Sequence, residues 1–160
     1  MTAQFSLCRG RGIRRTAFTL IEVLIVVVIM AVLAAVIIPQ FSSSTQDAKE
    51  SALKFDLGQL RTQIDMYKVH HAGLIPQITN GTLPQLTSAT DANGNIGTSG
   101  PQFPFGPYMI NGMPVNPVTG IGTVTATATF PPTAASGNNG WLFNPATGQL
   151  AADSAKYLTW

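Results

Sequence analysis

Charged residues are scarce in this 160-residue chain, because Asp, Glu, Lys and Arg together make up 10% of it, against roughly 25% in an average soluble domain. Cysteine is nearly absent as well: Cys8 is the only one, so no intramolecular disulfide can form. The segment that precedes Cys8 is too short and too polar to be the apolar region of a lipoprotein signal. These shortages exclude a disulfide-stabilised scaffold and direct attention to where the few charges lie.

The charges are divided unevenly along the chain. The first 17 residues contain four arginines and no acid, whereas the remainder carries five Lys and Arg against seven Asp and Glu, a balance of −2. The basic cluster borders an apolar run, so the preference for positive charge on the cytoplasmic side of a membrane explains it better than nucleic-acid binding does. We therefore expect no nucleic-acid partner.

The apolar run covers residues 18–38 and contains only two polar residues, Thr19 and Glu22. A helix of this length spans about 30 Å, the thickness of a hydrocarbon core. A buried core helix of this length and apolarity would be unusual in so small a protein. A secretory signal peptide has a shorter apolar region that ends in small residues, whereas this run ends in Ile-Ile-Pro-Gln. The run is therefore predicted to be a retained transmembrane helix.

Helical periodicity resumes after Pro39, which should kink or loosen the helix because proline lacks a backbone donor. The predicted amphipathic continuation covers residues 39–72, and Gly73 with Pro76 marks its end. Its charged residues occupy the remaining faces of the helix. The apolar residues that we expect on one face are Ala48, Ala52, Phe55, Leu60, Ile64 and Tyr67.

Residues 73–160 form a different region, rich in Pro, Gly, Asn and Thr and nearly free of charge. Asn80-Gly81 and Asn93-Gly94 predict turns, and residues 89–102 predict a loop. The Thr, Ala and Gly content of 89–100 and 131–139 is also typical of partial disorder. The predicted strands are 108–110, 123–130, 141–143 and 149–152, the last two joined by an Asn-Pro-x-x-Gly turn. The predicted fold class is α+β: a long N-terminal helix packed on a small C-terminal antiparallel β-sheet.

The segment Arg14-Arg15-Thr16-Ala17-Phe18-Thr19-Leu20-Ile21-Glu22 resembles the processing motif of type IV pilins and type II secretion pseudopilins. The resemblance extends over about 14–40, because Glu22 is the fifth residue counted from Phe18 and Pro39 is the twenty-second. Ala17 stands where the family usually has glycine. The resemblance implies a leader of residues 1–17 that a prepilin peptidase removes between Ala17 and Phe18.

The resemblance further implies N-methylation of Phe18 and an assembly role for Glu22, which would pair with the N-terminal amine of a neighbouring subunit. It implies a structural fibre subunit rather than an enzyme. The implied partners are further copies of the chain, other pseudopilins or pilins, the peptidase, an inner-membrane assembly platform and lipid. The implied location is the inner membrane, crossed once, with residues 73–160 forming an extracytoplasmic, β-rich region.

A second resemblance lies between residues 105 and 150, in a Gly-Pro-Tyr segment and a closing hairpin similar to those of major pseudopilins. That group often binds calcium through a C-terminal loop, but this chain has Asn116 where an aspartate is frequent and only Asp153 nearby. Calcium prefers several charged oxygen ligands, so we expect no metal or other cofactor, with calcium as the alternative. The adjacent pair His70-His71 is interpreted as a solvated helix end, not a metal site.

Three functions remain open at this point. The first is a subunit of a type II secretion pseudopilus or type IV pilus-like fibre, with the missing cysteines and the Gly-Pro-Tyr segment favouring the pseudopilus. The second is a membrane-anchored binding or DNA-uptake module, which the net charge of −2 disfavours. The third is a plain anchored protein whose motif match is accidental.

Overall fold

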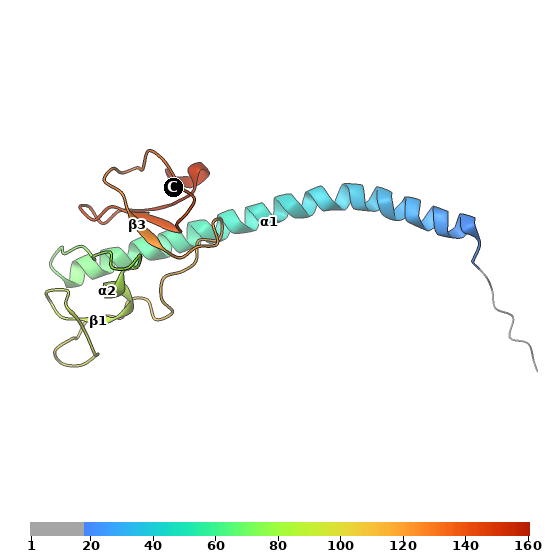
Figure 1. The fold of residues 1–160 in the computed structure, drawn as a ribbon. Coiled ribbons are helices and arrows are strands. Elements are labelled where there is room, and N and C mark those ends of the chain that lie inside the picture. The colour runs from blue at the N-terminus through green and yellow to red at the C-terminus, as the bar shows by residue number, and fades with distance from the viewer. Residues whose placement is uncertain (1–17) are drawn as a thin grey trace, which may run out of the picture. The chain divides into compact units, whose positions relative to one another are not determined.

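The computed structural model describes residues 18–160, so Ala17 and the rest of the leader lie outside the described residues. The chain divides after Ser43 into two units, each described by itself below. The helices are α1 (Leu20–His70), α2 (Pro84–Thr87) and the short 3-10 helix η1 (Ala155–Tyr157), and the strands are β1 (Ala89–Thr90), β2 (Ile96–Gly97), β3 (Val124–Ala126), β4 (Trp141–Phe143) and β5 (Leu150–Ala152) (Figure 1).

Helix α1 covers most of both predicted helical segments and ends at His70, two residues before the predicted end at 72. Pro39 lies inside α1, and the kink expected there remains a prediction. At the C-terminal end, Ala72 and Gly73 adopt positive φ angles of 52° and 90°. The Gly73 backbone N–H then donates to the Lys68 carbonyl at 2.8 Å, which is the usual way to satisfy the last carbonyls of a helix.

Within residues 44–160, the hydrophobic core lies between the second part of α1 and the three-stranded sheet. The helix contributes five fully buried side chains, and the sheet contributes the buried indole of Trp141 together with Phe143 and Leu150. Because 3.6 residues complete a turn, the buried helical positions recur at spacings of three and four. They are Leu53, Leu57, Leu60, Ile64 and Tyr67.

The apolar face predicted for this part of α1 was partly wrong. Leu60, Ile64 and Tyr67 are buried as expected, but Ala48, Ala52 and Phe55 are exposed. The prediction merged two neighbouring apolar faces of one helix. The core instead follows the continuous series of leucines that starts at Leu53, four residues before Leu57 and seven before Leu60.

The main sheet has the order β3-β4-β5. Strands β4 and β5 are antiparallel, with Trp141 opposite Ala152, and they form the predicted hairpin. Its turn is closed by the Gly148 N–H, which donates to the Asn144 carbonyl at 2.7 Å. Strand β3 pairs with β4 in parallel, with Val124 opposite Trp141. The α+β class is therefore confirmed, with a mixed main sheet.

Other strand predictions need correction. Residues 108–110 contain no strand, and the predicted strand 123–130 is reduced to three residues, because the chain turns away after Ala126. The predicted loop 89–102 contains an antiparallel pair, β1 with β2, in which Ala89 lies opposite Gly97. The predicted turn at Asn80-Gly81 is present, with φ angles of 49° and 70° between bridged threonines.

Candidate processing and assembly site

Two side chains, Thr19 and Glu22, close the first turn of α1. The Thr19 backbone N–H and hydroxyl both donate to Glu22 Oε2, each at 2.8 Å. The Glu22 backbone N–H in turn donates to Thr19 Oγ1 at 3.3 Å. This reciprocal arrangement is a capping box, and it satisfies donors that the first helical turn otherwise leaves unpaired. In the single chain, Glu22 is therefore a helix cap at the positive end of the helix dipole.

The capping box uses only one of the two carboxylate oxygens of Glu22. Within residues 18–160, no hydrogen bond to Glu22 Oε1 is present and no cation forms an ion pair with the carboxylate. An ionised carboxylate offers about four lone-pair sites. The geometry therefore leaves Glu22 able to accept a further donor from outside its own chain while it caps the helix.

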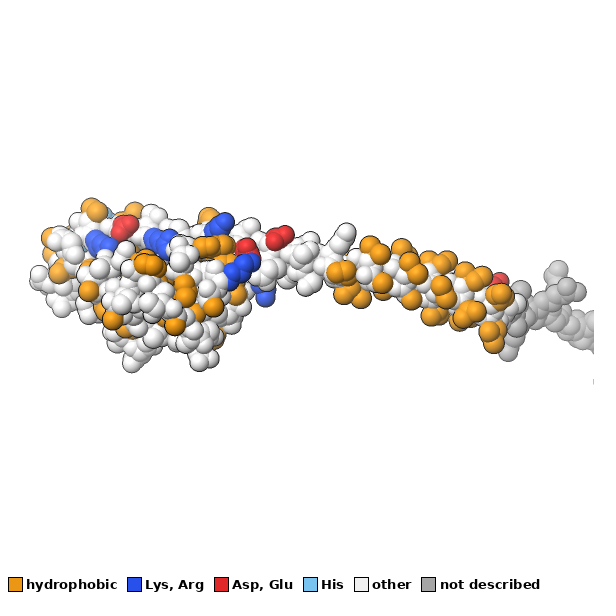
Figure 2. Space-filling view, turned by 90° about the horizontal axis from the view of Figure 1, so that it is seen from above, with side chains coloured by type: hydrophobic (Ala, Val, Ile, Leu, Met, Phe, Trp, Pro, Cys, Tyr) orange, Lys and Arg blue, Asp and Glu red, His pale blue; other side chains and the backbone are white. Residues whose placement is uncertain are grey.

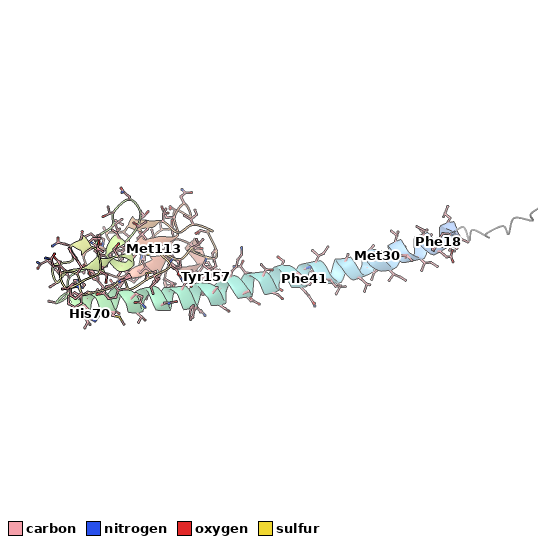
Figure 3. The ribbon with its side chains drawn as sticks, turned by 90° about the horizontal axis from the view of Figure 1, so that it is seen from below. Phe18, Met30, Phe41, His70, Met113 and Tyr157 are labelled. Atoms are coloured by element: carbon pink, nitrogen blue, oxygen red, sulfur yellow. The ribbon has the colours of Figure 1, made fainter. Side chains whose placement is uncertain are left out.

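The apolar part of α1 has no covering within its own unit. Phe18 is 85% exposed, and every residue from 18 to 43 is exposed. Figure 2 shows this half of the helix covered by hydrophobic side chains, and in Figure 3 the side chains of Phe18, Met30 and Phe41 point away from the helix. By length and composition, α1 is the one helix in the described part of the chain that can cross a membrane. Lipid or other helices must cover this surface.

A second singled-out position, Asn116, is fully buried beside the closing hairpin. Its Nδ2 donates to the Gly140 carbonyl at 2.7 Å, and its Oδ1 accepts the Val118 backbone N–H at 2.8 Å. The Asp153 backbone N–H donates to the same Gly140 carbonyl at 3.1 Å. Gly140 cannot carry a side chain, because an added Cβ would collide with the backbone of Ile121. The structure therefore brings Asn116 and Asp153 to one buried junction.

The Asp153 carboxylate closes the loop formed by residues 136–139. Its Oδ1 accepts the Ser136 backbone N–H at 2.6 Å, and its Oδ2 accepts the Ser136 hydroxyl at 2.5 Å and the Asn139 backbone N–H at 3.0 Å. Burial acts to raise the pKa of Asp153, but these donors outweigh it and hold the pKa below its ordinary value. Among residues 18–160, no three His, Cys, Asp or Glu side chains lie together as a metal site would require.

The histidine pair at the end of α1 is not uniformly solvated, so that prediction was wrong for His71. His71 is 1% exposed, its ring is stacked 4.0 Å from that of Tyr67, and its Nε2 lies 3.0 Å from Thr90 Oγ1. Its Nδ1 lies 2.8 Å from the Tyr67 carbonyl and must donate to it. His70 is exposed, with Nδ1 2.9 Å from the Tyr108 hydroxyl. His71 is buried because the β1 segment, distant in sequence, covers it.

Two groups of functional residues escaped the sequence-based prediction. The role of Thr19 could have been found, because Thr-x-x-Glu before an apolar run is the signature of a capping box. The pairing of Ser136 and Asn139 with Asp153 could not have been found, because it joins residues 14 to 17 positions apart and no local sequence pattern marks it.

The site and the fold together define a class. The apolar N-terminal helix starts with a capping box directly after Phe18. Its amphipathic continuation packs on a small sheet in an α+β arrangement. These are the features of a pilin-like protein with a membrane-spanning N-terminal helix. Residues 13–38 match the family model described as the prokaryotic N-terminal methylation motif.

Similarity to curated proteins extends beyond that motif. The chain is 30% identical over 111 residues to the type II secretion system core protein G of Escherichia coli, which covers 65% of this chain and 74% of that protein. The protein of the same name from Klebsiella pneumoniae is 32% identical over 104 residues, which covers 65% of this chain and 69% of that protein. No solved structure matches the chain.

A third relative matches more strongly over a shorter range. The core protein G of Pseudomonas aeruginosa is 41% identical over 56 residues, which is 35% of this chain and 39% of that protein's length. This chain belongs to the family of type II secretion system core protein G, and it is a pseudopilin with a prepilin-type motif.

Proposed function

We propose that this chain is a structural, non-catalytic subunit of a type II secretion pseudopilus, and that it polymerises through its N-terminal helix. The prepilin peptidase removes residues 1–17 between Ala17 and Phe18, and Phe18 is then N-methylated. The observation that carries the proposal is the exposed apolar segment that begins at Phe18, forms a helix from Leu20 onward, and holds a single carboxylate, that of Glu22, in the first helical turn. Mass spectrometry of the chain from membranes should give the mass of a protein that starts with N-methyl-Phe18.

The proposed assembly step is a pairing of the Glu22 carboxylate with the Phe18 amine of a neighbouring subunit. A carboxylate costs about 2.5–3.5 kcal/mol at the centre of a membrane helix on insertion scales. In a fibre core without water, both the amine and the carboxylate need a partner of opposite charge. Glu22 Oε1 supports the pairing, because this oxygen is not used by the helix cap.

The test compares Glu22→Val with Thr19→Ala in cells that carry the secretion system. Both variants break the reciprocal capping box, although Thr19→Ala keeps the backbone N–H that donates to Glu22. Only Glu22→Val loses the charge that would pair with a neighbour. We expect Glu22→Val to be inserted and cleaved but absent from the fibre fraction, while Thr19→Ala assembles nearly normally. Normal fibres from Glu22→Val would disprove the pairing. Equal assembly defects in both variants would show that Glu22 acts only as a helix cap.

The proposed partners are further copies of this chain, other pseudopilins, the prepilin peptidase, the inner-membrane assembly platform and lipid. Residues 73–160 lie on the extracytoplasmic side of the inner membrane, since the basic leader favours the cytoplasmic side. The alternative of a DNA-uptake module is not favoured, because the matching relatives are named as secretion proteins. A DNA-binding assay at several salt concentrations should detect no affinity in the chain.

We also propose that the C-terminal loop closes without calcium. The donors from Ser136 and Asn139 already occupy both oxygens of the Asp153 carboxylate. At the neighbouring junction, the Asn116 Nδ2 donates to the Gly140 carbonyl, and an amide nitrogen of this kind cannot coordinate a calcium ion. Neutral amide and hydroxyl groups therefore hold the loop closed, in place of a calcium ion with several charged oxygen ligands.

A further inference from the structure

The dipeptide Asn-Gly occurs repeatedly between residues 80 and 140. An asparagine that precedes glycine can lose its side-chain amide spontaneously, because glycine has no side chain to obstruct an attack by its own backbone nitrogen. The dipeptide is the same each time, so the tertiary structure must decide which copy reacts. The four copies are Asn80-Gly81, Asn93-Gly94, Asn111-Gly112 and Asn139-Gly140.

The reaction sets two structural requirements. The glycine backbone nitrogen loses its proton to solvent and attacks the side-chain carbonyl carbon of the asparagine. A C–N bond forms, the amide nitrogen leaves as ammonia with a proton taken from solvent, and a succinimide ring remains. Water then opens the ring at either carbonyl and leaves aspartate or isoaspartate. The glycine N–H must therefore be free, and the asparagine side chain must be free to turn toward it.

Asn139 and Gly140 meet neither requirement. The Asn139 Nδ2 donates to Ser136 Oγ at 3.2 Å and to Asp153 Oδ2 at 3.3 Å. Its Oδ1 accepts the Thr123 hydroxyl at 3.3 Å. The Gly140 N–H donates to the Thr123 carbonyl at 3.0 Å, and Gly140 is buried. Both reacting groups are engaged elsewhere, so the fold protects this pair.

Asn93 and Gly94 meet only one of the two requirements. Asn93 is exposed, but the Gly94 N–H donates to the Asp91 carbonyl at 3.0 Å. The Asn93 backbone N–H donates to Asp91 Oδ1 at 2.8 Å, so the turn is held at both residues. The hydrogen bond of Gly94 must break before its nitrogen can attack, which slows the reaction.

Asn80 and Gly81 lie in a turn that is closed on both sides. The Gly81 N–H makes no hydrogen bond within residues 18–160. The Thr79 N–H, however, donates to the Thr82 carbonyl at 2.9 Å, and the Thr82 N–H donates back to the Thr79 carbonyl at 3.0 Å. Ring closure would change the backbone angles of Asn80 and would strain this closed turn, so the pair reacts slowly.

Asn111 and Gly112 meet both requirements. Asn111 is exposed, and among residues 18–160 neither its side-chain amide nor the Gly112 N–H makes a hydrogen bond. A Cβ added to Gly112 would have no atom within 4 Å, so there is space for the ring. The chain turns at Ile110 and Asn111, but no backbone N–H from 110 to 115 donates a hydrogen bond in the described part of the chain. The backbone can therefore adopt the angles that ring closure needs.

Conversion of Asn111 would place a new carboxylate at a cleft that already holds one. Asn111 and Asp56 line the same cleft, which has a volume of about 390 Å³. Asp56 has no ion-pair or hydrogen-bond partner within residues 18–160, and burial raises the pKa of its carboxyl. A converted chain therefore differs from a new one by a negative charge beside Asp56, and isoaspartate would also lengthen the backbone there.

We propose that Asn111 is the site at which this chain deamidates, through attack by the Gly112 backbone nitrogen, and that the fold protects the other three Asn-Gly pairs. The site concerns the chemistry of the folded chain alone. It is therefore independent of the proposed fibre function and of the Glu22 pairing, and it can be tested on the isolated chain.

The experiment follows every Asn-Gly pair in one sample. The full-length chain is kept in detergent micelles at mildly alkaline pH, and peptide mapping by mass spectrometry measures the converted fraction of each asparagine over time. Asn111 should convert about ten-fold or more faster than Asn93 and Asn139, because hydrogen bonds must first break at those two pairs. Asn80 should lie between them. In urea the rates of the four pairs should become similar, since unfolding removes the protection.

Asn111→Gln is the matched control, because glutamine keeps an amide but would have to close a larger ring, which is far slower. This variant should show no conversion at 111 and an unchanged rate at Asn80. Conversion of Asn93 or Asn139 as fast as that of Asn111 in the folded chain would overturn the proposal, as would an Asn111 that reacts only in urea. The same peptide map of chain from membranes shows whether it starts at Phe18, so the processing step is judged separately.

Discussion

The two parts of α1 meet their surroundings in opposite ways. From 18 to 43 every residue is exposed and Glu22 is the one charged residue, whereas the part from 44 to 70 carries charges and buries five side chains in the core. Both parts are helical, and both are apolar enough to need a cover. The two parts differ in what packs on them. Residues 73–160 pack on one face of the second part, whereas no residue of its own unit packs on the first part.

This contrast shows how exposure in a single chain indicates assembly. An exposed apolar residue is ordinary on a protein surface, but a continuous exposed series is not. The first part of α1 is such a continuous series. It is uncharged apart from Glu22 and long enough to span a bilayer.

The largest effect should come from truncating a buried leucine in the second part of α1. Leu53→Ala should lower the free energy of unfolding by about 2–5 kcal/mol, because it leaves a cavity in a packed core. Leu24→Ala, in the first part, should leave the unfolding of residues 44–160 unchanged. Urea unfolding in detergent micelles, followed by the fluorescence of the buried Trp141, measures both. Equal destabilisation would mean that the two parts do not differ as described.

A smaller effect should follow the loss of the carboxylate that closes the C-terminal loop. Asp153→Asn should cost about 1–3 kcal/mol, because the amide that replaces the carboxylate keeps only one acceptor oxygen and no negative charge for the donors of Ser136 and Asn139. The folded-state pKa of Asp153 lies below its ordinary 3.8. Its contribution is therefore complete above the ordinary pKa and is lost as the pH falls through the folded-state value. Melting temperatures of the unaltered chain and of Asp153→Asn, taken at a series of pH values between about 2 and 7, measure this loss.

The metal-free closure of that loop can be tested on the same samples. Neither excess calcium nor a chelator should change the melting temperature of the unaltered chain, since a ligand that binds only the folded state would raise it. An increase with calcium that disappears in Asp153→Asn would contradict the proposed metal-free loop.

The smallest effect should come from the exposed attachment of η1 to α1. The Lys156 ammonium and the Tyr157 hydroxyl both donate to Glu50 Oε1, and they lower the pKa of Glu50 from 4.5 to about 2. In Lys156→Met this pKa should rise toward 4.5, which an NMR titration measures. The stabilisation from Glu50 is present above pH 4.5 and is lost as the pH falls toward 2. An unchanged titration would show that the contact is not formed.

Local patterns allowed several features to be predicted and left others out of reach. The hairpin of β4 and β5 was predictable because two apolar segments flank a turn sequence. The parallel pairing of β3 was not, since the connection from Ala126 to Trp141 carries no periodic signal. The burial of His71 was missed for a related reason: Thr90 lies 19 residues away.

The sequence by itself determined that Glu22 is the fifth residue from Phe18 and that the helix is long enough to cross a membrane, because both depend on spacing and composition alone. Processing between Ala17 and Phe18 stays a prediction from the same motif. Only the tertiary structure decided which apolar face of the second part of α1 is covered. Helical periodicity defines both faces, but the choice depends on how residues far along the chain pack. That choice buries Leu53 and leaves Phe55 exposed.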